Sequence, residues 1–574
     1  MDYDSDEDMR DLPIGRDDFI FIRENDGYYV DKTRLIPEIL ERRLTQTYLF
    51  TRPRRFGKSL NMSMLNAFFN RKYKGNGWFE GLEVDKHRDL DVHKNAYPVV
   101  KIDFNSLPCY EYGIFQAGFS LLVSRVLQNF SYLEKSEKLQ GNKSLKAFER
   151  LMSRESDDTE VQEGIRILCE LLTEHHGVKP IILIDEYDKP INSTFDREHH
   201  GKVLDYLRGF YSATLKGNEN MTLAVLTGVM QVAKESIFSG LNNLYVNNVL
   251  SEDFDECFGY TDKELKELLE HYERPDKYEE CKEWYDGYRF GNAEVYNPWS
   301  VNNYVKSRFK PDVYWGNTSS NDIIMTLMDF AGQDTYEELT ALGNGGTVLK
   351  DLRPAIPTRD LLKRKDSVYS IMVMAGYLNA RPEEDGYALS IPNKEVYKVF
   401  YDAMMYHMET PVSVQFRMLF RGLENGDVKK VEDNAFSILA ENFKAVQLKD
   451  EGDYQLIIAG AAMGMLGRYT ISVEMEAGNG RADMIMRRNR SGYPNIVVEF
   501  KRSVSDDPDD WKKEAEEGLE QIKRKGYHRG LEGKTLLYGV CFRNKKAKAV
   551  IETVSRRRGI IWRRTVVNPR CRDR

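Results

Sequence analysis

Residues 47–60 read Thr-Tyr-Leu-Phe-Thr-Arg-Pro-Arg-Arg-Phe-Gly-Lys-Ser-Leu, and this stretch decides the fold of the first half of the chain. Its first five residues are apolar, aromatic or β-branched and predict a short buried strand. A basic loop follows, and residues 60–69 have the spacing of a helix. Strand, glycine-containing loop and helix form a frequent phosphate-binding unit, because amide groups and the helix dipole at the N-terminus attract an anion.

The end of this loop, Gly57-Lys58-Ser59, supplies three chemical requirements of a phosphate site. The glycine lets the backbone approach the phosphates, the lysine reaches the β- and γ-phosphates, and the hydroxyl ligates Mg²⁺. Arg52 stands where the usual pattern has its first glycine. Two further arginines either add charge near the phosphates or form a solvated basic turn. The expected nucleotide-contacting residues are Arg54, Arg55, Phe56, Gly57, Lys58, Ser59 and Leu60.

A second apolar stretch, Pro180-Ile-Ile-Leu-Ile-Asp-Glu186, predicts a strand that is buried on both faces and ends in two carboxylates. The carboxyl ends of parallel strands are where α/β sheets bind their ligands. We expect Asp185 to hold Mg²⁺ and Glu186 to polarise the attacking water. The alternative is that these two acids only cap the end of a strand.

Strands and helices alternate through the first half of the chain. Further strands are predicted at residues 97–104, 179–184 and 221–227, with helices at 115–130, 160–175 and 203–215. This alternation predicts an α/β fold of the P-loop NTPase type, with a parallel sheet and helices on both faces. The region from 261 to 410 is mostly helical, and its residues 371–396 suggest a small winged-helix-like connector.

The C-terminal part carries a second pattern of charged residues, Asp483 followed by Val497-Val-Glu-Phe-Lys501. Strands are predicted at 469–476, 482–487, 495–502 and 535–542, with a helix at 509–525 before the last of them. Residues two apart on a strand share a face, so Glu499 and Lys501 point the same way, and Asp483 on the preceding strand can come alongside. Two carboxylates and an ammonium would then meet at one place on a sheet.

That combination suits phosphodiester hydrolysis. Asp483 and Glu499 would bind Mg²⁺ through their oxygens, and Lys501 would hold a water or stabilise charge in the transition state. The alternative is an exposed hairpin with surface salt bridges. Apolar residues surround the acids and favour a buried strand, namely Ile496, Val497, Val498 and Phe500.

Composition limits the possible classes of protein. The chain has 574 residues with 41% hydrophobic and 30% charged residues, which is enough for several domains with their own cores. It contains no apolar run long enough for a membrane span and no paired cysteine motif, so a reduced, cytoplasmic setting without membrane contact is expected. The net charge of −8 does not by itself indicate nucleic-acid binding, although basic residues dominate after Arg543.

Several motifs resemble the AAA-ATPase-like family, whose members typically carry a PD-(D/E)XK nuclease domain at the C-terminus. The resemblance rests on residues 28–33, 52–60, 183–188, 238–243, 284–288, 296–300, 314–315 and 391–396 and extends from about Leu12 to Phe542. It implies that Thr227 ends a sensor strand that reads the γ-phosphate. It also implies additional acids or amides at the nuclease site, with Glu451 and Gln521 as the candidates and Glu476 as a weaker one. The aromatic motifs between Trp284 and Trp299 suggest packing or an interface.

The sequence therefore predicts five parts: residues 1–12 as an acidic leader, 13–260 as a P-loop ATPase domain, 261–410 as a helical lid and winged-helix-like connector, 411–550 as an α/β restriction-endonuclease-like domain, and 551–574 as a basic tail. The expected function is an ATP-regulated nuclease that uses ATP with Mg²⁺ or Mn²⁺ and acts on DNA or RNA. Assembly into a homo-oligomer is compatible with this function. Two alternatives remain open: a nucleotide switch whose nuclease-like domain only binds nucleic acid or a protein partner, and a signalling ATPase whose C-terminal domain serves assembly.

Overall fold

The computed structural model describes residues 10–564 except 196, 232–236, 239–243, 317–337, 339–340, 344, 354–364, 408–409, 442–468, 478–479, 490–491, 544–545 and 558–559. These residues fall into two compact units. The first comprises residues 1–323 with 349–396, and the second comprises 324–348 with 397–574. Residues 261–316 belong to the first of these units. Among the described helices, none is long and apolar enough to cross a membrane.

A five-stranded sheet forms the centre of the first unit, in the order β2-β3-β4-β1-β5. All of its pairings are parallel, which confirms the expected α/β class. Its strands are β1 (Thr47–Thr51), β2 (Val99–Asp103), β3 (Ile181–Asp185), β4 (Leu223–Gly228) and β5 (Leu244–Asn247). Every residue of β1, β3 and β4 is buried, as expected for strands that are covered on both faces.

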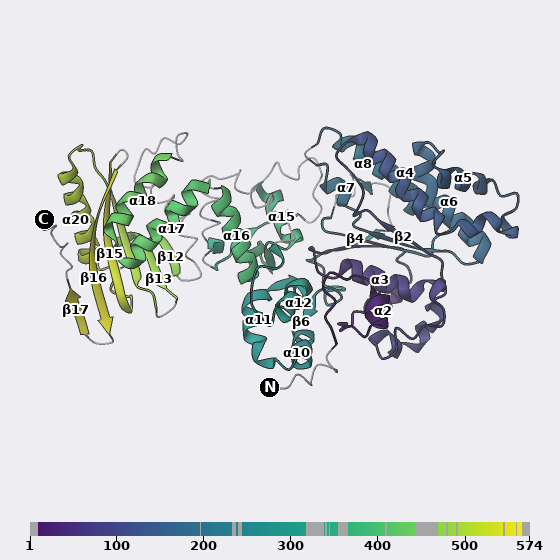
Figure 1. The fold of residues 1–574 in the computed structure, drawn as a ribbon, viewed down its shortest axis with the longest axis horizontal. Helices are drawn as coiled ribbons and strands as arrows, with labels where there is room; N and C mark the ends of the chain where they lie inside the picture. The colour runs from purple at the N-terminus through teal and green to yellow at the C-terminus, as the bar shows by residue number, and fades with distance from the viewer. Residues whose placement is uncertain are drawn as a thin grey trace, which may run out of the picture. The chain divides into compact units, whose positions relative to one another are not determined.

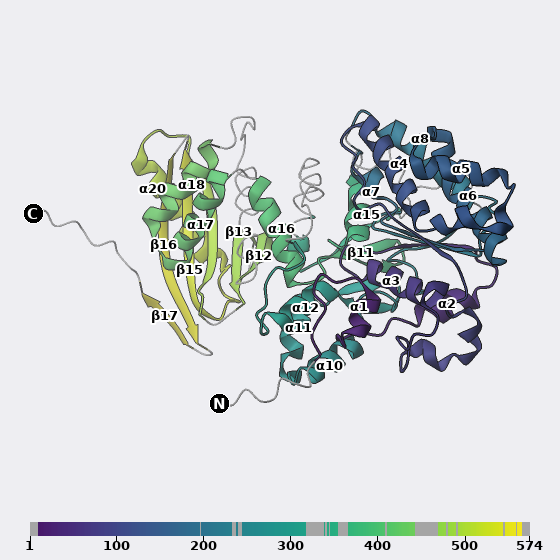
Figure 2. The same ribbon diagram turned by 45° about the vertical axis from the view of Figure 1, so that its right-hand side comes forward.

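Helices cover both faces of this sheet (Figures 1 and 2). One face carries α4 (Tyr112–Gln128), α5 (Lys143–Ser153), α6 (Asp158–His176) and α8 (His200–Leu215). The other carries α1 (Phe19–Glu24), α2 (Leu35–Glu41) and α3 (Lys58–Phe69). The short α7 (Lys189–Asn192) follows the acidic end of β3.

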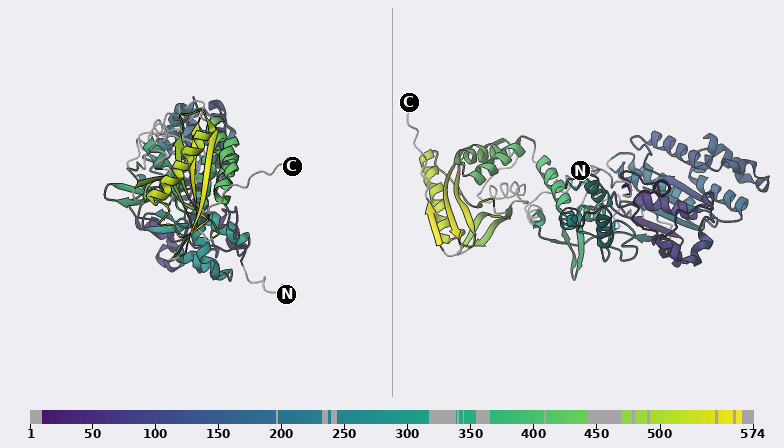
Figure 3. Two further views of the ribbon diagram at one scale, coloured as in Figure 1. Left: turned by 90° about the vertical axis from the view of Figure 1, so that its left-hand side faces the viewer. Right: turned by 60° about the horizontal axis from the view of Figure 1, so that its bottom comes forward.

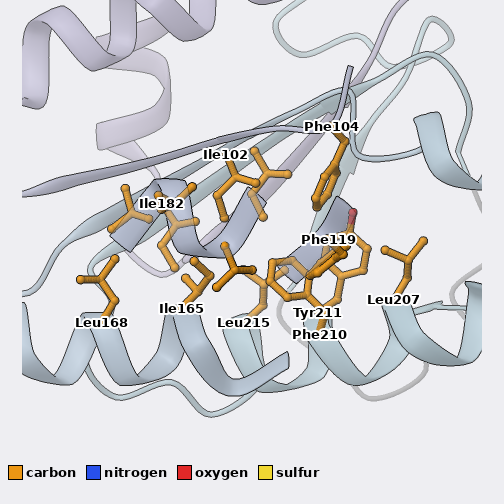
Figure 4. Close-up of a cluster of buried hydrophobic side chains, with 14 of the residues drawn as sticks. Ile102, Phe104, Phe119, Ile165, Leu168, Ile182, Leu207, Phe210, Tyr211 and Leu215 are labelled. Carbon is orange, nitrogen blue, oxygen red and sulfur yellow. The ribbon is translucent and has the colours of Figure 1, made fainter. Parts of the chain in front are cut away.

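The core between the sheet and the first group of helices is aromatic and aliphatic. Ile102 and Ile182 from neighbouring strands face Ile165 and Leu168 of α6, as Figure 4 shows. At the end nearer the loops, the rings of Phe104 and Phe119 meet those of Phe210 and Tyr211. This packing fixes the carboxyl ends of β2 and β3, where the acidic residues lie.

The aromatic region after the sheet forms its own small core within the same unit. It consists of β6 (Tyr260–Thr261), α10 (Asp262–His271), α11 (Tyr278–Tyr285), β7 (Tyr288–Phe290), β8 (Ala293–Tyr296) and α12 (Pro298–Lys306). Its three strands pair in the order β6-β8-β7. A second three-stranded sheet, ordered β10-β11-β9, contains β9 (Val348–Lys350), β10 (Asn379–Glu383) and β11 (Gly386–Ser390). Helix α15 (Lys365–Ala375) precedes the β10–β11 hairpin, and α16 (Lys394–His407) follows it.

The second unit contains a six-stranded mixed sheet with the strands in chain order. They are β12 (Tyr469–Ala477), β13 (Gly480–Arg488), β14 (Asn495–Arg502), β15 (Gly533–Arg543), β16 (Lys546–Arg557) and β17 (Ile560–Arg564). Only β14 and β15 pair in parallel, because α20 (Pro508–Lys525) connects them. Strands β16 and β17 extend the sheet past residue 550, where a basic tail was expected to begin.

Helices lie on both faces of this second sheet as well (Figure 3). Tyr538 of β15 donates its hydroxyl to the carbonyl of Leu423 at the end of α17 (Thr410–Asn425), at 2.9 Å. The next residue, Gly539, faces Ala515 of α20. Successive residues of a strand point to opposite faces, so α17 and α20 cover different sides. Helix α18 (Val428–Glu441) follows α17, and Glu432 accepts the N–H of Ala549 at 3.0 Å.

Gly539 allows α20 to lie unusually close to the sheet. A Cβ at this position would overlap the backbone oxygen of Ala515 and lie 2.8 Å from the nitrogen of Leu519. We therefore expect Gly539→Ala to lower the free energy of unfolding by about 1–3 kcal/mol, because helix backbone cannot yield as a side chain can. Urea unfolding followed by circular dichroism measures this change. Gly492→Ala is the matched control, since a Cβ there meets nothing within 4 Å, and equal losses in both variants would contradict the argument.

Candidate functional site

The phosphate loop joins β1 to α3 through two residues with left-handed backbone. Arg55 has φ +70° and Gly57, at the N-cap of α3, has φ +84°. A Cβ on Gly57 would meet nothing within 4 Å, so the glycine is required by backbone conformation and not by lack of space. No side chain caps α3, which leaves its first-turn amides available to an anion.

Lys58 lies inside this loop and is only 4% exposed. Its ammonium donates to the carbonyls of Arg52 at 3.2 Å and Pro53 at 3.1 Å. It also lies 3.8 Å from Oε1 of Glu186. The loop therefore holds the lysine between two carbonyls and the acid after β3, in the place that a phosphate-binding cation requires.

Arg52, which replaces the usual first glycine of the loop, is a structural anchor. It is fully buried and donates to Thr51, to Asn247 and to the carbonyl of Phe254. Its guanidinium also lies 4.8 Å from the ring centre of Phe258. Burial lowers the pKa of Arg52 to about 10, which leaves the group charged at neutral pH. The arginine thus ties the loop to β5 and to the segment after it, and it points away from the pocket.

Restoring the standard glycine at position 52 is expected to damage the protein. Arg52→Gly should lower the free energy of unfolding by about 2–4 kcal/mol, because it removes charge-assisted hydrogen bonds and leaves buried acceptors without donors. Denaturant unfolding of the full chain measures the loss. Arg54→Ala is the control, because Arg54 is exposed. A glycine variant as stable as the parent would show that Arg52 does not anchor the loop.

Acidic side chains gather at the carboxyl ends of β2 and β3. Asp185 ends β3, is 4% exposed and stands in register with Asp103 of β2. Burial, followed by the charges of Asp185 and Glu186, raises the pKa of Asp103. Glu186 has φ +53°, a left-handed conformation that is uncommon outside glycine. This turn aims the Glu186 carboxylate back toward Lys58.

Thr227 lies on β4, next to the acidic end of β3. Its hydroxyl is buried and donates to Oδ1 of Asp185, so the residue orients that acid and does not line the pocket. Asp188, which the sequence did not single out, holds the end of β4 by accepting the N–H groups of Val229 at 3.1 Å and Met230 at 2.8 Å. Burial, followed by the charge of Glu186, raises the pKa of Asp188 to about 6.

A pocket of about 400 Å³ opens over the loop. Its wall includes residues 54–60, the two acids Asp185 and Glu186 at the end of β3, and Lys189. Arg54 and Arg55 are exposed on it, and the Phe56 ring is buried against Tyr288 at 4.9 Å. The lining also includes residues 15–17 and 28–30 and the aromatic Trp299. An ammonium, a hydroxyl, two carboxylates and helix amides around one hollow fit a magnesium–nucleotide complex.

The second group of candidate residues lies where β13, β14 and α20 meet. Glu499 is 2% exposed, and Lys501 on the same face lies 3.4 Å from Glu499 Oε1. Asp483 of β13 accepts the N–H of Phe500 at 2.6 Å, which brings the acid beside β14. Gln521 of α20 donates its amide to Glu499 Oε1. A Cβ on Gly518 of α20 would lie 3.5 Å from the carbonyl oxygen of Glu499 and from Cγ of Lys501, so this part of the helix packs next to the pair.

The electrostatics at Glu499 suit a cation. Burial, followed by the charge of Asp483, raises the pKa of Glu499 to about 7. Its Oε2 is buried and has no hydrogen-bond partner in the described part of the chain. A buried carboxylate with an open lone pair beside a second carboxylate is suited to Mg²⁺ or Mn²⁺, which keep several waters and need few protein ligands. No group of three or more acidic, histidine or cysteine residues at metal-binding distances occurs among the described residues.

The structure thus brings Asp483, Glu499, Lys501 and Gln521 together, and it places Lys58, Ser59, Asp185 and Glu186 around one pocket. Glu451 lies outside the described residues. Glu476 lies on β12, paired in register with Arg481. Sequence reasoning missed the anchoring role of Arg52. The available signal was its position directly after a buried strand, where a charged side chain can also be buried.

The fold and the two sites define a chain that joins a P-loop ATPase-type domain to a restriction-endonuclease-type domain. Comparisons with known proteins agree with this class. Residues 13–238 match the family model described as "Predicted AAA-ATPase", and residues 449–553 match that of the "PD-(D/E)XK nuclease superfamily". These matches confirm the domain layout expected from the resemblance. The chain is also 29% identical over 553 residues to a protein of Azotobacter chroococcum mcd 1 named "Uncharacterized protein in vnfD 5'region", covering 90% of this chain and 92% of that protein.

Proposed function

We propose that this chain is an ATP-binding and ATP-hydrolysing protein whose second domain is a metal-dependent nuclease acting on DNA or RNA. The observation that carries the nuclease part is the meeting of Asp483, Glu499 and Lys501 on one side of β13 and β14. The observation that supports the ATPase part is the buried Lys58, which lies 3.8 Å from Glu186 and lines a pocket of nucleotide size.

At the first site, Lys58 and the amides of α3 would bind the phosphates, and Ser59 with Asp185 would hold Mg²⁺. Mg²⁺ would neutralise charge on the β- and γ-phosphates. Glu186 lies close enough to Lys58 to face the terminal phosphate, where its carboxylate would orient the attacking water. Thr227 would keep the Asp185 carboxylate in position.

At the second site, Asp483 and Glu499 would hold Mg²⁺ or Mn²⁺, and the bound cation would polarise the phosphate and acidify a water. Lys501 would hold that water or stabilise charge on the phosphate in the transition state. Gln521 would keep Glu499 turned toward the cation, because its amide occupies Oε1 and leaves Oε2 open. The side-chain amide thus acts through the carboxylate and not on the substrate.

The test uses the purified full chain with Mg²⁺ or Mn²⁺ and three substrates: plasmid DNA, single-stranded DNA and RNA, each with and without ATP. Cleavage of at least one substrate, abolished by chelation and in Asp483→Asn, is the expected result. ATP turnover is measured in the same samples. Nucleotide binding without any cleavage would favour the second candidate, a nucleotide switch whose nuclease-like domain binds nucleic acid or a protein partner. The raised pKa of Glu499 and its open oxygen favour the nuclease.

A further inference from the structure

A buried carboxylate, Glu395, lies at the start of α16 and accepts three hydrogen bonds. Its Oε1 accepts the N–H groups of Tyr314 and Trp315, both at 2.6 Å, and its Oε2 accepts the hydroxyl of Ser300 at 2.7 Å. Glu395 is fully buried. These donors are all neutral, so burial dominates and raises the pKa of Glu395 to about 7. Among the described residues no cation pairs with this acid, and burying a carboxylate without one is costly for the fold.

The residues that Glu395 holds contact the phosphate loop. The indole N–H of Trp315 donates to the carbonyl of Arg54 at 3.3 Å. Trp299, which precedes Ser300 on α12, lies 4.2 Å from the guanidinium of Arg55 and lines the nucleotide pocket. One carboxylate therefore fixes two tryptophans that touch neighbouring residues of the loop.

The same network explains the aromatic motifs for which the sequence offered no chemistry. Asn393, just before α16, donates to the carbonyl of Asp286 at 2.8 Å. A Cβ on Gly287 would overlap the carbonyl oxygen of Pro392, so the two backbones touch directly. Motif residues from 284–288, 296–300, 314–315 and 391–396 thus converge on the first turn of α16.

Helix α16 also marks a boundary in the chain. It runs over Lys394–His407, and the division between the two compact units falls after Val396. Its first residues, which include Glu395, belong to the first unit, and its residues from 397 onward belong to the second. A helix transmits displacement along its axis because its backbone hydrogen bonds make it stiff.

We propose that Glu395 is a positioning residue that links nucleotide occupancy of the pocket, through Trp315 and Trp299, to the start of α16. This inference rests on the proposed function, because it requires that ATP bind at the phosphate loop. Phosphates on the loop shift Arg54 and Arg55, and the two tryptophans pass this displacement to the carboxylate. The coupling free energy is the difference between the interaction free energy of this network with the loop when ATP is bound and when it is absent.

Hydrogen–deuterium exchange on the full chain tests the link without relying on catalysis. ATP is expected to slow exchange in residues 394–407 of the wild type about tenfold or more, which is a typical coupling. Glu395→Ala should remove this ATP-dependent protection while ATP still binds. Glu395→Gln should retain the ATP-dependent protection. Its amide oxygen can accept the N–H groups of Tyr314 and Trp315, and its amide N–H can donate to the Ser300 hydroxyl, which then acts as an acceptor.

Trp315→Phe provides a second variant if Glu395→Ala does not fold. It keeps a ring in the core and removes only the indole N–H that reaches the loop, so it should also reduce the protection. Glu383→Ala on β10, an exposed position, is the matched control. ATP-dependent protection that survives both Glu395→Ala and Trp315→Phe would overturn the inference.

The two proposals fail in different ways. ATP binding to the wild type without protection of residues 394–407 overturns the link through Glu395 and leaves the proposed function standing. Absence of ATP binding overturns the ATPase proposal and this inference with it. Where the wild type cleaves nucleic acid, the ratio of cleavage rates with and without ATP should fall toward one in Glu395→Ala and recover in Glu395→Gln. A purely structural role would lower both rates together and leave their ratio unchanged.

Discussion

Replacing Lys501 by alanine is expected to lower the rate of phosphodiester cleavage by about 10²- to 10³-fold, the usual loss when one group that stabilises transition-state charge is removed. Lys501 is 27% exposed and lies 3.4 Å from Glu499, so its ammonium is within reach of a phosphate held at the same carboxylate. The initial rate at saturating Mg²⁺ measures the effect. Binding of the cation should persist, because both carboxylates remain.

Lys513→Ala on α20 is the matched control for this prediction. Its side chain is 71% exposed and forms an ion pair with Asp510 one turn away, so cleavage should be unchanged. Asp483→Asn should lose activity to a similar extent as Lys501→Ala, and chelation should abolish it in every variant. Undiminished cleavage in Lys501→Ala would place the chemistry elsewhere.

Replacing Lys58 by alanine is expected to weaken ATP binding by about 10²-fold, which corresponds to about 3 kcal/mol, and to abolish ATP turnover. The ammonium is buried and donates to two backbone carbonyls, and the phosphates would replace these carbonyls as its acceptors. Isothermal calorimetry and release of inorganic phosphate measure the two quantities. Thermal unfolding of the variant shows whether the fold is retained.

Lys74→Ala is the control, because Lys74 is an exposed lysine shortly after α3. Glu186→Gln separates binding from hydrolysis, since it removes the carboxylate and leaves the loop intact. We expect this variant to bind ATP with nearly unchanged affinity and to lose most of its turnover. Parent-like ATP turnover in Lys58→Ala would mean that the nucleotide is hydrolysed at another site.

Much of the fold could be predicted because buried strands have strong local signals. For four of the five strands of the parallel sheet, the expected ends lie no more than two residues from the observed ones. Each of these strands is a short apolar run before a polar turn. Strand β5 was missed because it has only four residues, the last of which is Asn247, and a second asparagine follows it. Strands β16 and β17 were missed because their many basic residues indicated a solvated segment, although alternation along a strand lets charged residues remain at the surface.

The candidate sites were predictable where the chemistry lies within one motif. Lys58 and Ser59 are adjacent, and Glu499 and Lys501 are separated by one residue, so local geometry alone places each pair. Long-range relations were not predictable in the same way. The hydroxyl of Thr227 turns to Asp185 because a buried carboxylate needs a donor, and nothing in the residues around Thr227 indicates this partner.

The buried arginine before the phosphate loop has a consequence for how variation in this chain should be interpreted. A loop of the usual kind takes its shape from its own glycines, whereas this one is braced by Asn247 and Phe254, about two hundred residues later. We therefore expect substitutions of Asn247 and Phe254, which do not line the pocket, to change the shape of the loop. If the proposed function holds, a scan of tolerated changes should show that substitutions at residues 247–258 impair ATP binding, although most of these residues do not line the pocket.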